Sequence, residues 1–221
     1  MKFINYEDVK KLTRQDLIKE IKAKANKISE IKLGDFLFTD DGSFAPTHGV
    51  YLFLNENKEV LYVGKNSARS YIERIPAHFD VRFAAWMNSF FMDYIKAKNI
   101  NITPNLIRNM YNSSEVQNQI KNDVMHIHNN YYISFIYMPG FSLFQKDYKD
   151  KRSQAIQGKI NRLEQFFLAE YIQPKLNGRR SDKRGTYNKK LDQIIVKKAE
   201  KEKRKIELDD ITLDDFEKYK P

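Results

Sequence analysis

Two short apolar runs separated by one tight turn constrain the fold of this chain more than any other feature. Residues 49–54 read Gly-Val-Tyr-Leu-Phe-Leu, and residues 59–64 read Glu-Val-Leu-Tyr-Val-Gly. The residues between them, 55–58, are Asn-Glu-Asn-Lys, and such residues favour turns. The pattern therefore predicts a β-hairpin.

The register of this hairpin decides which side chains meet across the two strands. Pairing Leu54 with Glu59 would place Tyr51 opposite Tyr62, so that both phenols emerge on one face of the sheet. Lys65 follows the second strand directly. Two adjacent phenols next to a lysine indicate a functional site rather than an ordinary surface.

Composition indicates a folded protein with a polyanionic partner. The chain has 221 residues, of which 41% are hydrophobic and 13% aromatic, enough for one sizeable domain with appendages or two small domains. Its net charge is +10. Lysine and arginine that neutralise phosphates release counterions, so this charge favours nucleic acid as the partner.

The sequence gives no sign of membrane insertion, secretion or disulfide bonds. No apolar run approaches the length of a membrane span, and residues 1–8 lack the apolar core of a signal peptide. Cysteine is absent, which excludes disulfides and thiolate metal sites. We therefore expect an intracellular, cytoplasmic protein that does not bind membranes.

Further elements predict a mixed α/β (α+β) fold. The alternating run at 131–138 predicts a third strand, which gives a small three-stranded, mainly antiparallel sheet. Helices are expected within 6–30 and over 159–173, with Pro174 ending the second. These helices would flank the sheet.

Charge changes sharply near the end of the chain. Residues 179–205 contain 12 Lys or Arg and 4 Asp or Glu, whereas residues 206–221 contain 2 Lys and 6 acidic residues. The expected organisation is an N-terminal helical and basic extension (1–45), a core (46–178) with a helical insert at about 80–130, and a basic helical C-terminal extension with an acidic tail (179–221).

Three charged or titratable residues stand out beyond the hairpin. Arg74 and His78 are four residues apart, a spacing that places both on one face of a helix. Pro76 lies between them, so the helix either kinks there or begins near this proline. Glu164 lies on an otherwise apolar helical stripe, where a carboxylate is costly unless it is paired or binds a cation.

These pieces, in this order, resemble the GIY-YIG nuclease superfamily over residues 46–178. The matching segments are Gly49-Val50-Tyr51, Tyr62-Val63-Gly64, Arg74 with His78-Phe79, Leu163-Glu164 and Pro174 with Asn177. The resemblance is to restriction-endonuclease-like members and implies a GIY-YIG-like sheet and hydrolysis of phosphodiester bonds.

The resemblance implies a role for each matching side chain. Tyr51 and Tyr62 would be the active-site phenols, one of which helps to deprotonate the attacking water. Arg74 would bind the scissile phosphate, and His78 would handle a proton or hold a phenol. The segment from Gly64 to Arg74 is longer than in the family, so Arg69 remains an alternative phosphate ligand.

The resemblance also implies a metal. Glu164 would be the sole carboxylate ligand of Mg²⁺, with Mn²⁺ as the alternative, and Asn177 would brace the site. A single carboxylate suits Mg²⁺, which keeps several waters and substrate oxygens. Glu170, later in the same helix, remains an alternative to Glu164. Lys65 would lower a tyrosine pKa or contact phosphate.

The basic residues near these motifs are candidate contacts to DNA phosphates: Lys65, Arg69, Arg179, Arg180, Lys183 and Arg184. The expected function is a metal-dependent endonuclease acting on double-stranded DNA, most specifically a type II restriction enzyme. Cutting both strands of a palindrome favours a homodimer. The alternatives are a GIY-YIG nuclease of a phage, mobile element or repair pathway, and a non-catalytic DNA-binding module with this fold.

Overall fold

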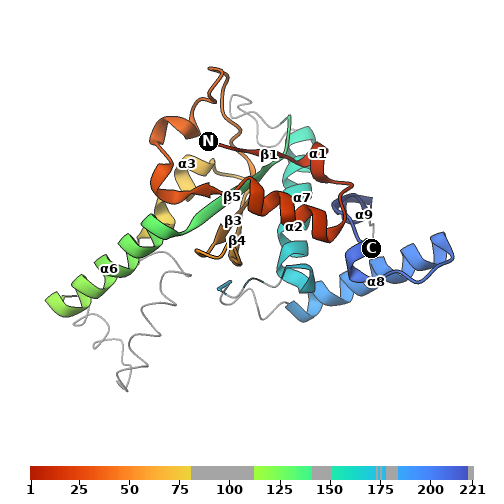
Figure 1. The fold of residues 1–221 in the computed structure, drawn as a ribbon. Coiled ribbons are helices and arrows are strands. Elements are labelled where there is room, and N and C mark those ends of the chain that lie inside the picture. Colours follow the sequence, from red (N-terminus) through yellow and green to blue (C-terminus); the bar gives the residue numbers. More distant parts are fainter. Residues whose placement is uncertain (81–111, 141–150, 173, 175, 178–183, 219–221) are drawn as a thin grey trace.

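The computed structural model describes residues 1–80, 112–140, 151–172, 174, 176–177 and 184–218 (Figure 1). Within these residues the protein is a mixed α/β fold with one sheet and helices on both of its faces. The strands are β1 (Ile4–Asn5), β2 (Asn26–Lys27), β3 (Gly49–Leu54), β4 (Val60–Asn66) and β5 (Tyr132–Tyr137). The α-helices are α1 (Tyr6–Val9), α2 (Arg14–Ala23), α3 (Tyr71–Arg74), α6 (Ser114–Asn130), α7 (Lys151–Phe166), α8 (Arg184–Glu202) and α9 (Leu213–Lys218).

The described sheet contains the three predicted strands and two more. Strand β3 lies in the middle and pairs antiparallel with both β4 and β5. The other edge of β5 is covered by β1, which is parallel to it, and by β2, which is antiparallel. The expectation of three strands was therefore too small. Strands β1 and β2 have two residues each, too few to show any hydrophobic period in the sequence.

Strand β3 is buried on both faces, because every one of its six residues is buried. Val50 and Leu52 belong to a core cluster on one face, together with residues of α2, α7, α8 and α9. Tyr51 and Phe53 belong to a second cluster on the opposite face. The two clusters are called the α7 face and the tyrosine face below.

The hairpin register differs by two residues from the predicted one. Tyr51 pairs with Gly64 and Phe53 pairs with Tyr62, with a β-bulge between Phe53 and Leu54. The bulge adds a residue to β4, because Leu54 pairs with Val60. A shift of two keeps each side chain on its face, so Tyr51 and Tyr62 are still diagonal neighbours on the tyrosine face.

The turn itself explains where the hairpin closes. The side-chain oxygen of Asn55 accepts hydrogen bonds from the backbone N–H groups of Asn57 and Glu59, at 3.0 and 2.8 Å. Lys58 has a positive φ of 57°, in the left-handed region. Asn55 and Glu59 also bond through their backbones. The turn residues were thus predicted correctly, but their hydrogen bonds place the first strand pair one residue later than expected.

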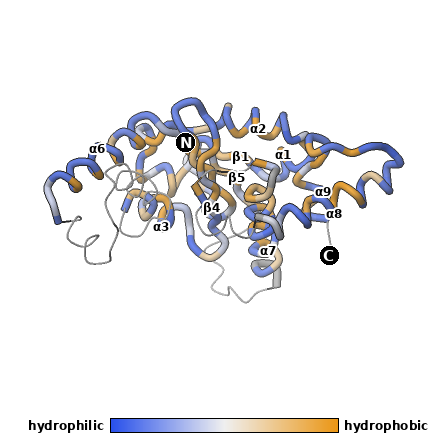
Figure 2. The backbone as a smooth tube through the Cα atoms, turned by 90° about the horizontal axis from the view of Figure 1, so that it is seen from below, coloured by the Kyte–Doolittle hydropathy of each residue, from blue (hydrophilic) through white to orange (hydrophobic). Residues whose placement is uncertain are grey.

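Helices from both the N-terminal and the C-terminal parts of the chain pack against the α7 face of the sheet. Figure 2 shows hydrophobic segments gathered at the strands in the centre and hydrophilic ones over much of α2 and α6. Core residues come from α2, α7, the segment directly after α7, α8 and α9: Leu17, Ile21, Leu163, Phe167, Leu191, Ile194, Leu213 and Phe216. The segments expected as terminal extensions therefore share one core with the hairpin.

Helix α7 is longer at its start than predicted. It begins at Lys151 rather than after Gly158, which lies in its interior. A glycine inside a helix costs only about 1 kcal/mol relative to alanine, so it does not mark a helix start. The helix continues as a π-helical segment, Phe167–Tyr171, with a non-helical ψ of −173° at Ala169. Of the predicted insert, α6 is described, and 81–111 lies outside the described residues.

Candidate functional site

The two tyrosines of the predicted motif differ in their exposure. Tyr51 is completely buried, and its hydroxyl is hydrogen-bonded to Nε2 of His78 at 2.6 Å. Tyr62 is half-buried, with its ring centroid 6.3 Å from that of Tyr51. Gly64 makes this arrangement possible. A Cβ at position 64 would lie 2.2 Å from Cζ of Tyr51 and 2.3 Å from its hydroxyl.

His78 lies among aromatic rings. Its ring centroid is 5.1 Å from that of Tyr62 and 5.3 Å from those of Tyr51 and Phe53, all in edge-to-face contacts. Burial, aided by the positive charge of Arg74, lowers the pKa of His78 to about 3. The imidazole is therefore neutral at neutral pH and shares a hydrogen bond with the Tyr51 phenol.

Pro76 does not interrupt a helix between Arg74 and His78. Helix α3 ends at Arg74, and a separate 3₁₀ helix, Pro76–Phe79, begins at the proline. Proline is well suited to the first turn of a helix, where its missing N–H is not needed. This is the second of the two geometries expected from the sequence.

Arg69 and Arg74 act on different neighbours. Arg74 is half-buried and close enough to His78 for its charge to lower the histidine pKa. Arg69 is exposed, and its charge contributes to the lowered pKa of Glu73, after the larger effect of the hydrogen bonds from Ser70. Arg74 is therefore the arginine whose charge acts on His78, whereas the charge of Arg69 acts on Glu73.

Glu164 lies on the α7 face and is ion-paired with Lys65. The distance from Nζ of Lys65 to Oε2 of Glu164 is 2.9 Å. The carboxylate side chain is only 3% exposed, whereas the lysine side chain is 26% exposed. Strand alternation explains the position of Lys65, which pairs with Val50 on the α7 face while the adjacent Gly64 faces Tyr51.

Asn177 joins the loop after α7 to the outer edge of β4. Its Oδ1 accepts a hydrogen bond from the Val63 N–H at 2.9 Å, and its Nδ2 donates to the Val63 carbonyl at 2.6 Å. The neighbouring Leu176 N–H donates to the Leu61 carbonyl at 2.8 Å. Asn177 therefore satisfies the backbone of an edge strand.

The predicted site residues converge on four consecutive residues of β4. Tyr62 and Gly64 face the buried phenol and imidazole, Lys65 faces Glu164, and the backbone of Val63 is bound by Asn177. The two groups of side chains thus lie on opposite faces of the same strand. Strand β4 is the last strand on the described path of the sheet, and Leu176 and Asn177 bind the backbone of its outer edge between the two faces.

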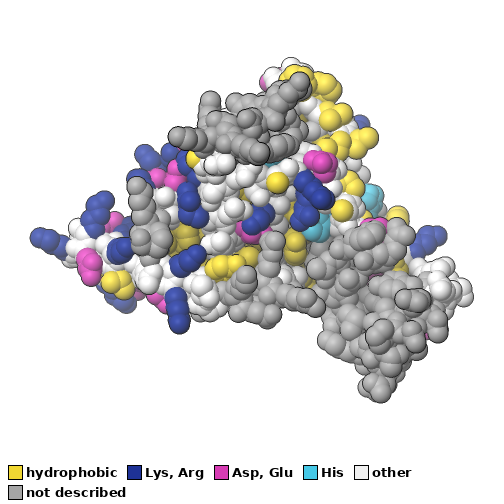
Figure 3. Space-filling model, turned by 180° about the vertical axis from the view of Figure 1, so that it is seen from behind, with side chains coloured by type: hydrophobic (Ala, Val, Ile, Leu, Met, Phe, Trp, Pro, Cys, Tyr) yellow, Lys and Arg dark blue, Asp and Glu magenta, His cyan; other side chains and the backbone are white. Residues whose placement is uncertain are grey.

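One face of the molecule carries charges of both signs. In Figure 3, the molecule is seen from behind, and lysine, arginine, histidine and acidic side chains lie close together near the middle of the view. Further basic side chains are spread over the side on which α8 lies. A negatively charged ligand would therefore meet cations on several elements.

The described residues offer few protein ligands for a divalent cation. No group of three His, Asp or Glu side chains with metal-binding geometry occurs in the part of the chain that the structure describes. Glu164 fits a cation that needs few protein ligands, because it is a buried carboxylate that already pairs with a positively charged side chain. This donor set is compatible with Mg²⁺ and too small for a cation that needs a full cage of protein ligands.

Several predicted residues cannot be placed. Arg179, Arg180 and Lys183 lie outside the described residues, as does Gln173. Arg184 begins α8 and Glu170 lies in the π-helical segment, and the side chains of both are outside the described part.

One aromatic residue near the site escaped the sequence interpretation. Tyr71 is buried behind Tyr51, with ring centroids 6.4 Å apart, and its hydroxyl donates to the Ile136 carbonyl at 3.4 Å. Burial raises its pKa well above the ordinary value of tyrosine. The signal was a capping box, in which Ser70 and Glu73 cap each other's backbone and start α3 at Tyr71.

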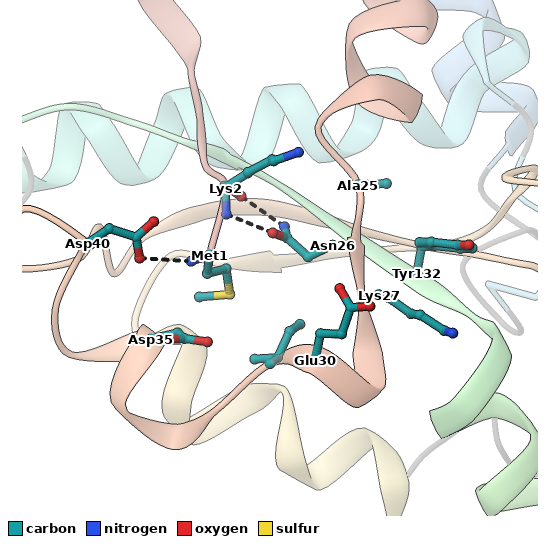
Figure 4. A pocket seen from close by; sticks show the side chains of 10 residues that line it. Met1, Lys2, Ala25, Asn26, Lys27, Glu30, Asp35, Asp40 and Tyr132 are labelled. Atoms are coloured by element: carbon teal, nitrogen blue, oxygen red, sulfur yellow. Dashed lines mark hydrogen bonds and ion pairs between the residues drawn. The ribbon is translucent and has the colours of Figure 1, made fainter.

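A separate pocket lies near the N-terminus, on the side of the sheet formed by β1 and β2. Its volume is about 500 Å³, and Figure 4 shows Met1, Lys2, Asn26 and Asp40 around it. Asn26 bonds the backbone of Lys2, and the Met1 amine pairs with Asp40 at 3.5 Å. None of the residues predicted from the motifs lines this pocket.

Comparison with known proteins adds no relative. No family model, no curated protein and no solved structure matches this chain. Among the described helices, none has the length and apolar character of a membrane span.

Proposed function

We propose that the protein is a metal-dependent endonuclease that hydrolyses phosphodiester bonds of double-stranded DNA. The observation that supports this most directly is the set of groups along β4. A phenol–imidazole pair lies on one face of the strand, and a buried carboxylate with a lysine lies on the other. These are the groups that phosphodiester hydrolysis requires: a route for a proton, a phosphate ligand and an anionic metal ligand.

The exposure of the side chains suggests a separate role for each tyrosine. Tyr62 is half-buried and is the phenol that a substrate reaches first, whereas Tyr51 is fully buried and bonded to His78. Tyr51 and His78 then hold the proton network behind Tyr62. Arg74, beside His78, supplies positive charge for the phosphate.

Glu164 would hold Mg²⁺, or Mn²⁺ in its place. When bound, such an ion polarises a phosphoryl oxygen and lowers the pKa of its bound water. Asn177 keeps β4 and the end of α7 together, so that Lys65 and Glu164 remain aligned. The GIY-YIG resemblance is the reason for assigning these groups to one reaction.

At the finer level we propose a type II restriction enzyme acting as a homodimer inside the cell. The net charge of +10 supports binding to DNA, and the absence of cysteine suits a reducing compartment. A nuclease of a phage, mobile element or repair pathway would use the same site.

One observation favours a second candidate, a non-catalytic DNA-binding module. The ion pair of Lys65 with Glu164 already neutralises the carboxylate that would bind the metal. Incubation of the purified protein with plasmid and Mg²⁺ separates the candidates. Discrete fragments support restriction, nicking or smearing supports the other nuclease roles, and intact plasmid together with DNA binding supports the module.

A further inference from the structure

The contact between Lys65 and Glu164 has a consequence for metal binding. A carboxylate that is 3% exposed is costly unless a positive charge accompanies it, and Lys65 supplies that charge at 2.9 Å. A divalent cation would need the same carboxylate. Two cations a few ångströms apart repel each other strongly at a buried site, so lysine and metal compete for Glu164.

The side chain of Lys65 is placed so that it can move away from Glu164. Its side chain is 26% exposed, and its amine sits at the end of a flexible four-carbon stem. It also lies in β4, the last strand on the described path of the sheet, so the stem starts at the sheet edge. The lysine side chain is therefore partly open to solvent even while it is paired with Glu164.

We propose that Lys65 is the counter-ion of Glu164 in the metal-free protein and that a divalent cation displaces it. The inference rests on the metal site of the proposed function. Lys65 then lowers the affinity for metal in the absence of DNA. Once displaced, its amine reaches the surface beside β4, where it can bind a phosphate of the substrate. Lys65 thus couples metal binding to DNA binding.

The test measures Mg²⁺ binding to the full chain without DNA, by isothermal titration calorimetry. Lys65→Gln removes the charge while keeping a hydrogen-bond donor, and Lys65→Arg keeps the charge. Lys205→Gln is the matched control, since Lys205 is 85% exposed and pairs with Glu207. We expect Lys65→Gln to bind Mg²⁺ about tenfold more tightly than the wild type, because a nearby like charge is gone. Lys65→Arg and Lys205→Gln should bind as the wild type does.

Two results would overturn the proposal. One is a Mg²⁺ affinity of Lys65→Gln equal to that of Lys205→Gln. The other is a gain in affinity that persists when Glu164→Gln is added, because the metal would then bind elsewhere.

A second measurement needs no variant and covers the case in which Lys65→Gln fails to fold. Acetylation of the wild-type protein, followed by mass spectrometry, should label Lys65 faster when Mg²⁺ is added. Unchanged labelling at saturating Mg²⁺ would contradict the displacement.

The plasmid assay separates this inference from the nuclease proposal. Tighter Mg²⁺ binding by Lys65→Gln with an uncut plasmid would support the lysine exchange and reject the nuclease. Cleavage by the wild type with no change of Mg²⁺ affinity in Lys65→Gln would support the nuclease and reject the exchange.

Discussion

At the scale of single residues, the site depends on a glycine under a tyrosine ring. Any side chain at position 64 would meet Cζ, Cε2 and the hydroxyl of Tyr51 within 2.6 Å. Tyr51 is fully buried and has no space into which to retreat. Gly64→Ala should therefore destabilise the protein by about 1–3 kcal/mol, the usual cost of overpacking.

Urea denaturation measures this effect, and a second glycine provides the control. Gly158 lies inside α7, and a Cβ there would meet only Arg162 at 3.5 Å. Gly158→Ala should stabilise the protein by about 0.5–1 kcal/mol, because alanine is the better helix former. Equal effects of the two substitutions would contradict the close approach at Gly64.

His78 makes stability depend on pH. Its folded-state pKa of about 3 lies below the value of about 6.5 for an unfolded histidine. The unfolded chain therefore binds more protons between these values, and stability falls as the pH falls from about 6.5 toward 3. His78 should contribute at most about 2 kcal/mol of lost stability between pH 7 and pH 5.

Denaturation of His78→Gln at both pH values isolates this contribution from that of the carboxylates. The variant should lose less stability than the wild type between pH 7 and pH 5. His126→Gln, at an exposed position of α6, should keep the wild-type difference. A His78→Gln difference as large as that of the wild type would show that His78 is not held neutral.

At the scale of elements, Asn177 links α7 to the edge of the sheet. Its side chain makes two hydrogen bonds to the backbone of Val63. Asn177→Ala should cost about 1–3 kcal/mol, because it leaves a buried N–H and a buried carbonyl without this partner.

Hydrogen exchange gives a local measurement of the same link. The Val63 amide should exchange faster in Asn177→Ala, while Asn118→Ala, at an exposed position of α6, should leave it unchanged. Unaltered protection of Val63 in Asn177→Ala would mean that the edge of β4 does not depend on the side chain.

The elements also show what the sequence could and could not predict. The runs that form β3, β4 and β5 could be predicted because their strand-like residues are consecutive in the sequence. The turn at Asn55 could be predicted for the same reason. The β-bulge near Leu54 depends on hydrogen bonds across the hairpin and has no sequence pattern of its own. The start of α7 at Lys151 differs from the expected one because Gly158 lies inside the helix, where a glycine is tolerated.

Part of the candidate site could likewise be predicted from the sequence, and part could not. The alternation of β3 and β4 predicted that Tyr51 and Tyr62 share a face. The two tyrosines do share a face, although the register is shifted by two residues. The pairing of Lys65 with Glu164 joins segments far apart in the chain, so no local pattern contains it. The sequence indicated that Glu164 needs a partner, but only the fold identifies which cation is nearest.

At the scale of the whole molecule, the C-terminal segment is part of the core. Residues of α8 and α9 pack with β3 and α7, and the Tyr6 hydroxyl donates to Glu217 at 2.9 Å. Phe216→Ala should therefore cost about 3 kcal/mol, as expected for a large side chain removed from a core.

Phe38→Ala is the matched control, because Phe38 is 51% exposed and Phe216 only 9% exposed. Thermal or urea denaturation should show a much smaller effect for Phe38→Ala. Equal effects would mean that the C-terminal helix is an appendage and not part of the core.

The central claim is that β4 carries a metal-dependent nuclease site. It is tested most directly by comparing the wild type with Glu164→Ala in plasmid cleavage with Mg²⁺, while DNA binding is measured in parallel by gel shift. We predict that the wild type cuts the plasmid and that Glu164→Ala binds DNA nearly as well but does not cut. Cleavage by Glu164→Ala at the wild-type rate, or an intact plasmid with the wild-type protein, would contradict the account.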